Sequence, residues 1–597
     1  MSKKSDGQIR RSQAITTWGP GSLLDLPRHA VIVGGLDTWP LTKDLDEIHE
    51  PRLARKLSEM THILTPRFYA PPADSNDPRE KKLGIVVWSF PDWFVVQEER
   101  GEERERSRRL VKRKALDEKG RIEGRLVVPT RFVRACPRGH IDDLDWWRFV
   151  HAEDKCRRQL WLDETGTTGD LGDLRVRCEC GKSRGLHEAA VLELKPLGSC
   201  NGSRPWLGAD ASEACGLPSR LLIRTAANAY FPQVMSVLSL PDRGSAVQVV
   251  VSELWEDLQI VDDTADLKVL KKKPRIAETL ASFIDAEVLE AIRERKSGGA
   301  TERPVKQVEL DALLAVQEGF GDDVPVDPNF HARRLPDHTW RHSKRSQEIE
   351  AVIQVHRLRE VQTLTGFTRF EAVTPDIDGE YESDVERADL AREPKWFPAV
   401  ENRGEGVFVQ LRASSIREWL GRSRVKTRLD HLAVGHARFV AERSAKTQRP
   451  FPGGPYVLLH TLSHLFIQSL AMRSGYPASS IRERIYADSE TGRYGILLYT
   501  GTPDADGTLG GLVQQGRHIE SHLAHALWMA ALCSNDPICA QHDPSETHEG
   551  RWLHGASCHG CALIAETSCE MRNDYLDRAL VVPVLTHSDA AFFGATG

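Results

Sequence analysis

Apolar positions along the chain follow two different periods. In about the first 95 residues, short apolar runs such as HAVIVGGL (29–36) and GIVVWSFPDWFVV (84–96) alternate with turn-forming segments, which is typical of buried β-strands. Between about 250 and 345, apolar residues recur near every 3.6 positions in the segments 251–263, 276–296 and 307–320. We therefore expect strands in the N-terminal part and helices in the middle of the chain.

The last third combines both patterns. The run YVLLHTLSHLFIQSLAM (456–472) is interrupted by polar side chains, so it predicts a buried helix rather than a membrane span, and Gly475 suits its C-terminal cap. Ser480 and Glu483 stand in capping-box register, which predicts a second helix starting at 480. Three further segments predict a buried strand, a helix and a short helix, in that order: 493–500, 519–533 and 570–581.

Charge narrows the functions that the chain can serve. The formal net charge is −6 over 597 residues, so nucleic acid would have to bind to local basic patches. The charged segment 98–121 predicts a solvated loop or helix, and its basic half is a candidate phosphate contact: Arg108, Arg109, Lys112, Arg113 and Lys114. The start of the chain, MSKKSDGQIRRSQ, shows no apolar signal core, so we expect a cytoplasmic protein whose thiols stay reduced.

Cysteines form two groups, and the C-terminal group predicts a zinc site. The spacing is C-x5-C followed by C-x2-C-x7-C, and the CHGC turn at Cys558 and Cys561 suits tetrahedral zinc. Five cysteines compete for four places. We favour Cys539, Cys558, Cys561 and Cys569, with Cys533 in reserve. The alternatives are a redox C-x2-C motif, which normally opens a helix after a strand, and plain buried thiols.

The upstream cysteines lie in two stretches with glycine-containing turns, which resemble the halves of a zinc ribbon. Cys136 and His140 with Cys178 and Cys180 would close one site. An all-thiolate set of Cys178, Cys180, Cys200 and Cys215 is equally admissible, and the sequence does not choose between them. Cys156 fits the core of a helix as well as it fits a zinc site.

These features together predict a mixed α+β, multidomain protein. A zinc-ribbon-like module is inserted in the N-terminal half, the middle is helical, and a helix-rich α/β domain at the C-terminus is closed by a four-cysteine zinc knuckle. The expected regions are an N-terminal α/β region, the zinc-ribbon-like region, the helical middle and the C-terminal domain: 1–95, 96–240, 241–345 and 346–597.

Most enzyme motifs are missing from the sequence. CGKSRG carries a Gly-Lys-Ser, but Val176 stands where a Walker A loop needs its first glycine, and neither G-x-S-x-G nor H-E-x-x-H occurs. One enzyme-like pair remains, because His460 and His464 at i, i+4 share a helix face and are able to chelate a metal with a third ligand such as Asp488 or Asp506. A metal-dependent hydrolase or nuclease is therefore the alternative to a non-catalytic protein, although a satisfied core histidine pair explains the same pattern.

Several stretches of the chain resemble the DrmB family of the DISARM anti-phage defence system. They include SQAITTWGPGSLLDLP, CPRGHIDDLDWWRFVH, HTLSHLFIQSLAMRSGYPASSIRERIY and LHGASCHGC followed by ETSCEMRNDYLDRAL. The last third is similar to a domain fused to, or encoded beside, superfamily 2 DNA helicases, in which four C-terminal cysteines bind zinc.

The resemblance implies a partner rather than a second activity. A DrmA-like helicase subunit would hold the ATPase motifs, and the pair would bind invading DNA at a single-stranded end. The zinc cluster of the family matches Cys539, Cys558, Cys561 and Cys569, and Cys533 is an addition to that pattern. Arg572 and Arg578, on the short helix predicted after Cys569, are further candidate phosphate contacts.

Overall fold

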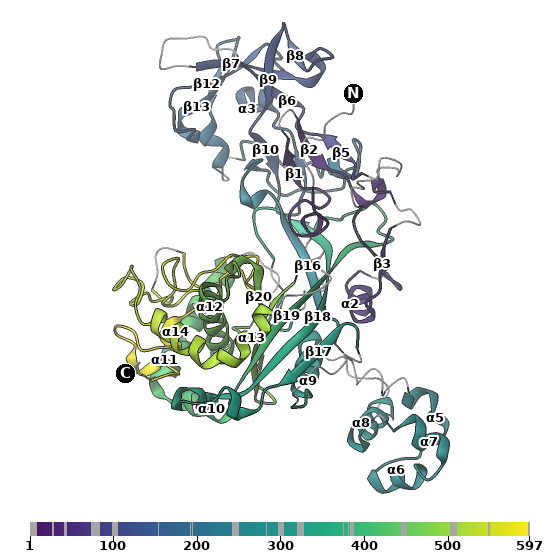
Figure 1. Ribbon diagram of the computed structural model, residues 1–597. Helices are drawn as coiled ribbons and strands as arrows, with labels where there is room; N and C mark the ends of the chain where they lie inside the picture. The colour runs from purple at the N-terminus through teal and green to yellow at the C-terminus, as the bar shows by residue number, and fades with distance from the viewer. Residues whose placement is uncertain are drawn as a thin grey trace. The chain divides into compact units, whose positions relative to one another are not determined.

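The computed structural model divides the chain into two compact units (Figure 1). Unit 1 comprises Met1–Ser236, Gln362–Val373 and Ser383–Glu401, and unit 2 comprises the remaining segments Val237–Val361, Thr374–Glu382 and Asn402–Gly597. Residues 9–594 are described except for 27–28, 41–44, 62, 73–83, 98–105, 153–154, 192, 194, 241–246, 248–249, 282, 297–303, 319–326, 374, 380, 382–386, 443–449, 502–509 and 547–549. The protein is a mixture of α and β structure, as predicted.

Antiparallel sheets dominate the described part of unit 1. A three-stranded sheet has the order β1 (Leu23–Asp25), β2 (Ala30–Val33), β5 (Val87–Ser89), and another has the order β11 (Ile141–Asp142), β10 (Phe132–Ala135), β15 (Arg220–Ile223). The largest sheet has the order β14 (Ser183–Gly185), β13 (Leu174–Cys178), β12 (Leu160–Glu164), β7 (Arg106–Lys112), β6 (Trp93–Val96), β9 (Arg125–Pro129), β8 (Arg121–Ile122). Shorter elements are β3 (Glu47–Ile48), β4 (Phe68–Tyr69), α1 (Gln13–Thr16), α2 (Pro51–Thr61) and α3 (Trp146–His151).

Strand β7 corrects one prediction. Residues 98–105 of the charged segment lie outside the described residues, but the next seven form a central strand instead of a loop or helix. Leu110 and Val111 are buried between β6 and β12, and Arg108 is paired with Glu164 on the neighbouring strand at 2.7 Å. Charge along this segment is neutralised across the sheet, which allows a strand that the local charge density alone does not predict.

The middle of the chain forms a small group of helices with its own apolar core, as the 3.6-residue period predicts. These helices are α5 (Trp255–Leu258), α6 (Thr264–Leu270), α7 (Pro274–Thr279) and α8 (Asp285–Lys296). Leu258, Leu267, Leu280 and Ile292 are fully buried among them. Helix α9 (Val305–Leu314) follows and packs on strand β20 of the sheet in unit 2.

Side chains alternate between the two faces of that sheet. Strand β21 (Arg493–Thr500) pairs with the C-terminal part of β19 (Phe397–Leu411) on one side and with β20 (Ile481–Asp488) on the other. Ile481 and Ile485 of β20 point to the face covered by helix α12, whereas Tyr486 points to the face covered by α9. Strand β17 (Phe330–Arg334) pairs with β18 (Ile349–Thr368), and β16 spans Phe231–Leu238.

Helix α12 (Gly454–Ser474) lies against β20 (Figure 1). Most of its side chains are buried, polar ones included, as predicted for this long apolar run with polar interruptions. Gly475 ends it with a φ of 77°, a conformation that glycine adopts without strain, so the predicted cap is confirmed. The other helices of this region are α10 (Ala413–Gly421), α11 (Ser423–Glu442), α13 (Gly511–Gln515) and α14 (Ile519–Ala530). Among the described residues, no helix has both the length and the apolarity that crossing a bilayer requires.

Two helix predictions in this region are wrong. The segment after Ser480 is strand β20, because it pairs along its whole length with β21, from Ile481 opposite Thr500 to Asp488 opposite Arg493. The segment 570–581 consists of turns and one short 3-10 helix, Arg578–Leu580. Arg572, Asn573 and Tyr575 have φ values of 52°, 67° and 59°, which are incompatible with an α-helix.

Candidate metal centres

Four cysteines near the C-terminus converge in what we call the thiolate cluster: Cys533, Cys539, Cys558 and Cys561. The Cys533–Cys558 sulfurs are 3.4 Å apart, and the Cys539–Cys561 and Cys558–Cys561 sulfurs are each 3.7 Å apart. A disulfide would need about 2.05 Å. Four sulfurs about 2.3 Å from a tetrahedral zinc ion lie about 3.8 Å from one another, so the observed spacing fits a zinc site.

Turns rather than regular elements position these sulfurs. Helix α14 ends at Ala530 and leads into the turn that carries Cys533 and Cys539, and the CHGC turn carries the other two. The amide of Gly560 donates to the Cys558 sulfur, and the amide of Cys558 to the Cys561 sulfur, each at 3.3 Å. These N–H groups stabilise negative charge on sulfur, as thiolate ligands require.

Arg578 fixes one side of the thiolate cluster. Its guanidinium is fully buried, donates to the Ala530 carbonyl at 2.9 Å and pairs with Asp536. Asp536 in turn accepts the amide of Cys533. A hydrogen bond from Cys561, followed by smaller effects that include Arg578, lowers the pKa of the Cys539 thiol to about 5. Arg578 therefore holds the turn that carries Cys533 and Cys539 and does not face solvent, contrary to its predicted role as a phosphate contact.

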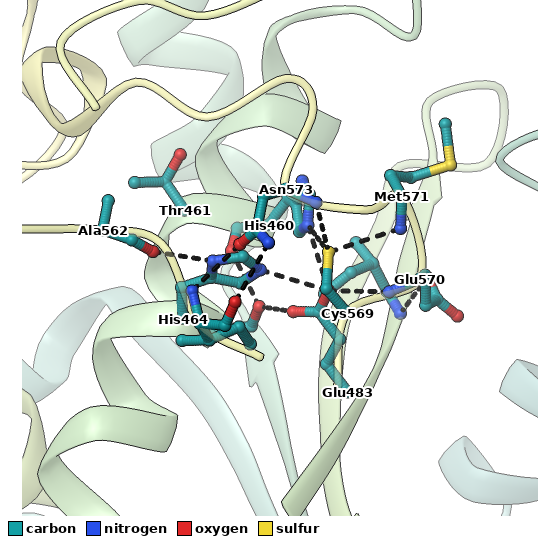
Figure 2. Close-up of polar contacts among 12 residues, drawn as sticks. His460, Thr461, His464, Glu483, Ala562, Cys569, Glu570, Met571 and Asn573 are labelled. Carbon is teal, nitrogen blue, oxygen red and sulfur yellow. Dashed lines mark hydrogen bonds and ion pairs between the residues drawn. The ribbon is translucent and has the colours of Figure 1, made fainter. Parts of the chain in front are cut away.

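Cys569, which the spacing assigned to this cluster, lies elsewhere. It converges with His460, His464 and Glu483 in what we call the histidine cluster (Figure 2). The His460 Nε2 atom is 3.1 Å from the Cys569 sulfur and 3.0 Å from Glu483 Oε1, and His464 Nε2 is 3.4 Å from the same oxygen. Both histidines and Glu483 are completely buried.

Regular elements bring the histidine cluster together. His460 and His464 lie one turn apart on α12, and Glu483 has the same parity on β20 as Ile481 and Ile485, so its carboxylate faces that helix. Burial alone would raise the pKa of the Glu483 carboxyl, but the two imidazoles hold it well below its usual range. Burial also lowers the pKa of His464 and raises that of Cys569.

The upstream cysteines form two clusters in unit 1, and neither matches a predicted grouping. Cys136 and His140 lie with Cys200 and Cys215. The Cys136 sulfur is 3.3 Å from His140 Nδ1, and the Glu213 carboxylate accepts the other ring nitrogen, Nε2, at 2.7 Å. Such an outer hydrogen bond orients a metal-binding imidazole, so this set has the composition and support of a three-cysteine, one-histidine zinc site.

The second cluster of unit 1 consists of His151, Cys156, Cys178 and Cys180. His151 Nε2 is 3.3 Å from the Cys180 sulfur, and Nδ1 donates to the carbonyl of Trp147 at 2.8 Å. The Cys156 and Cys178 sulfurs are 3.7 Å apart. Hydrogen bonds, first that from the backbone of Lys182 and then that from His151, lower the pKa of the exposed Cys180 to about 6.

Sequence reasoning missed His151 and Glu483 as candidate ligands and left Cys156 open. His151 stands five residues before Cys156 on the last turn of α3, a histidine–cysteine spacing that was visible in the sequence. Glu483 was assigned to a helix cap, which concealed its position opposite the histidine pair. Of the suggested third ligands, Asp488 pairs with Arg493 at 2.9 Å, and Asp506 lies outside the described residues.

The predicted phosphate contacts of unit 1 are mostly engaged within the protein. Arg109 pairs with Glu123 at 2.9 Å, Arg113 with Asp92 at 3.4 Å, and Lys112 lies over the rings of Trp93 and Trp147. Lys114 is exposed. In unit 2, Arg572 is half-buried in the turn after Cys569.

Comparison with known proteins places these centres in a family. Residues 462–562 match the MrfA Zn-binding domain, a range that holds the whole thiolate cluster, and residues 10–231 match a domain of unknown function, DUF8724. A DISARM protein DrmB of Bacillus paralicheniformis is 31% identical over 481 residues, which cover 78% of this chain and 82% of that protein.

The chain belongs to the DrmB family. The resemblance seen in its motifs is thus confirmed over most of its length. This member of the DrmB family matches a zinc-binding domain and carries four cysteine-containing clusters. Together, the two findings indicate that it binds zinc.

Proposed function

We propose that this chain is a zinc-binding, non-catalytic subunit of the DISARM anti-phage system that associates with a DrmA-like superfamily 2 helicase and helps to bind invading DNA. Membership of the DrmB family supports the defence role. In this proposal the two clusters of unit 1 stabilise a zinc-ribbon-like region, and the thiolate cluster is the zinc knuckle of the C-terminal domain.

Three exposed apolar side chains that are close in sequence to the thiolate cluster support a protein partner. Trp528 near the end of α14 is 66% exposed, and Leu532 and Ile538, which neighbour Cys533 and Cys539 in sequence, are each 77% exposed. Exposed large apolar side chains mark interaction sites where they gather on one surface, and the metal would make the turns that carry Leu532 and Ile538 rigid. This apolar group is the observation that carries the proposal of a helicase interface.

Co-purification of the full chain with a co-expressed DrmA-like helicase tests this interface. The triple variant Trp528→Ser/Leu532→Ser/Ile538→Ser should weaken binding by about tenfold or more, since exposed aromatic and apolar anchors dominate interfaces. Ile260→Ser/Val269→Ser is the matched control, because these side chains are 69% and 62% exposed in the separate helical group. Equal retention of the helicase by all three proteins would contradict the assignment.

DNA binding is proposed for the same complex, with contacts to phosphates as its basis. Lys114 is exposed in the short 3-10 helix that follows β7, whereas its neighbours Arg109 and Arg113 are engaged in ion pairs. Lys114→Glu should weaken binding to DNA with a single-stranded end and reduce the slope of log affinity against log salt by about one. Lys268→Glu, an exposed lysine of α6, is the control with the same charge change. A similar loss in both variants would point to net charge rather than to a contact.

The burial of the histidine cluster favours the non-catalytic proposal over a hydrolase. A catalytic zinc site keeps a position open for water, whereas here four protein groups converge and three of them are completely buried. We expect the purified chain to hydrolyse neither ATP nor DNA by itself. Cleavage that is lost in His460→Ala/His464→Ala while the protein stays folded would overturn this expectation.

A further inference from the structure

The histidine cluster contains four metal-ligating side chains that take no part in the thiolate cluster. All four candidate ligand atoms lie within 4.8 Å of one another. Nitrogen, oxygen and sulfur ligands at about 2.0–2.3 Å from tetrahedral zinc are about 3.3–3.6 Å apart. The three contacts of 3.0, 3.1 and 3.4 Å among these atoms are close to that spacing.

The tautomer of His464 is determined by its surroundings. Its Nδ1 atom lies 2.8 Å from the Ala562 carbonyl, which only accepts, so Nδ1 carries the proton (Figure 2). The neutral ring therefore presents a lone pair from Nε2 toward the oxygen of Glu483, and Nε2 has no hydrogen-bond partner among the described residues. Two electron-rich atoms facing each other in a buried site require a cation between them.

The carboxylate of Glu483 lacks a basic partner of the usual kind. In the described part of the chain it contacts the two imidazoles, the hydroxyl of Ser463, the thiol of Cys569 and the amide of Glu570, the last at 3.1 Å. No lysine or arginine of that part forms an ion pair with it. Since a buried carboxylate is costly without a counter-charge, a bound metal ion would supply the missing positive charge.

Cys569 is prepared for the thiolate state. Its sulfur accepts the amides of Met571 at 3.4 Å and Asn573 at 3.1 Å (Figure 2). The positive φ of Arg572 turns the chain so that the next N–H group, that of Asn573, reaches the sulfur. The same backbone strain that prevents a helix after Cys569 therefore builds a sulfur-binding turn.

We propose that His460, His464, Glu483 and Cys569 form a second metal site in the C-terminal part, distinct from the thiolate cluster and closed to solvent. Two imidazoles, one thiolate and one carboxylate in a compact, four-coordinate set select a zinc-class divalent ion. Since four protein groups fill the shell, the ion is structural: it joins α12 and β20 to the turn that carries Cys569.

Metal counting on the purified full-length chain tests the proposal. After dialysis against a chelator that leaves the wild-type protein loaded, Glu483→Gln and Cys569→Ser should each contain one zinc ion fewer per chain. Glu360→Gln is the matched control, because Glu360 is an equally buried carboxylate of the same unit that pairs with Arg482 rather than with histidines. Unchanged zinc content in Glu483→Gln and Cys569→Ser would overturn the site.

Combining variants separates this site from the thiolate cluster. Cys558→Ser/Cys561→Ser should lose one ion, and adding Cys569→Ser should remove a second. If Cys569 instead served the thiolate cluster, the third substitution would remove nothing further. Should a variant fail to fold, anomalous scattering at the zinc absorption edge from wild-type crystals decides: a peak between His460 and Cys569 supports the site, and none there contradicts it.

Discussion

The two clusters of the C-terminal part are built in opposite ways. The ligands of the thiolate cluster stand on turns between α14 and the end of the chain, and Cys533 and Cys558 are only half-buried. Three ligands of the histidine cluster stand on α12 and β20, inside the largest apolar core. In the first case a bound metal would give order to a segment without regular structure, and in the second the core places the candidate ligands before any metal binds.

Removing the thiolate ligands should therefore have the largest effect. Cys558→Ser/Cys561→Ser should lose one zinc ion and the order of the segment between Cys533 and Cys561, because structural zinc contributes on the order of 10 kcal/mol to small metal-dependent folds. Limited proteolysis and hydrogen exchange would show the change within this segment. Ser534→Ala, at an exposed neighbour of Cys533, should leave both measurements unchanged.

A buried ion pair also fixes the C-terminal turns to the core, independently of any metal. Arg428 on α11 pairs with Asp577 at 2.6 Å, and the two side chains are 2% and 0% exposed. Arg428→Met should lower the free energy of unfolding by about 3–5 kcal/mol, since it leaves a buried carboxylate unpaired. Urea denaturation measures this loss, and Arg428→Met/Asp577→Leu should recover part of it. No recovery would mean that the pair acts through its contacts to the backbone.

The comparison also predicts an order of metal release. Zinc should leave the half-buried thiolate cluster roughly tenfold or more faster than the histidine cluster, because the second requires opening of the core. A chromogenic chelator followed over time should resolve a separate phase for each of these two clusters in the full-length chain, in addition to any release from unit 1. Cys558→Ser/Cys561→Ser should remove the fast phase of this pair, and loss of the slow phase instead would reverse the comparison.

The two clusters of unit 1 also differ in how exposed their cysteines are. Cys180 is exposed, whereas Cys136 in the other cluster is completely buried. After mild chelation, iodoacetamide should label Cys180 before Cys136, with little change in the melting temperature. Mass spectrometry of digested protein reads out the order of labelling, and prior labelling of Cys136 would show that its cluster opens more readily.

The sequence predicted the ligand types better than their grouping. The C-x2-C spacing predicted that the sulfurs of Cys558 and Cys561 lie together, because their placement on one tight turn is a local property. The choice between Cys533 and Cys569 depended on the direction in which the turn after Cys561 leads, which spacing does not encode. Similarly, the two upstream clusters combine cysteines differently from either predicted grouping. Antiparallel strands bring cysteines that are distant in sequence together, and spacing does not encode this.

The prediction of β20 shows why Glu483 was missed. Ser480 and Glu483 satisfy a local rule for a helix start, but pairing with β21 outweighs local preference. Only the strand geometry turns Glu483 toward α12 while Arg484, its neighbour, turns to Glu309 on the opposite face at 2.5 Å. The helices α12 and α14 were predictable because their apolar runs are long.

The distance along the chain between His460 and Cys569 has a mechanical consequence. These residues are 109 positions apart, so an ion held between them ties the chain into a loop of that size. Like a disulfide of similar span, such a cross-link would restrict the unfolded chain by roughly 4–5 kcal/mol in the loop-entropy model. A bound metal would then cross-link the chain as a disulfide does, without requiring an oxidising environment.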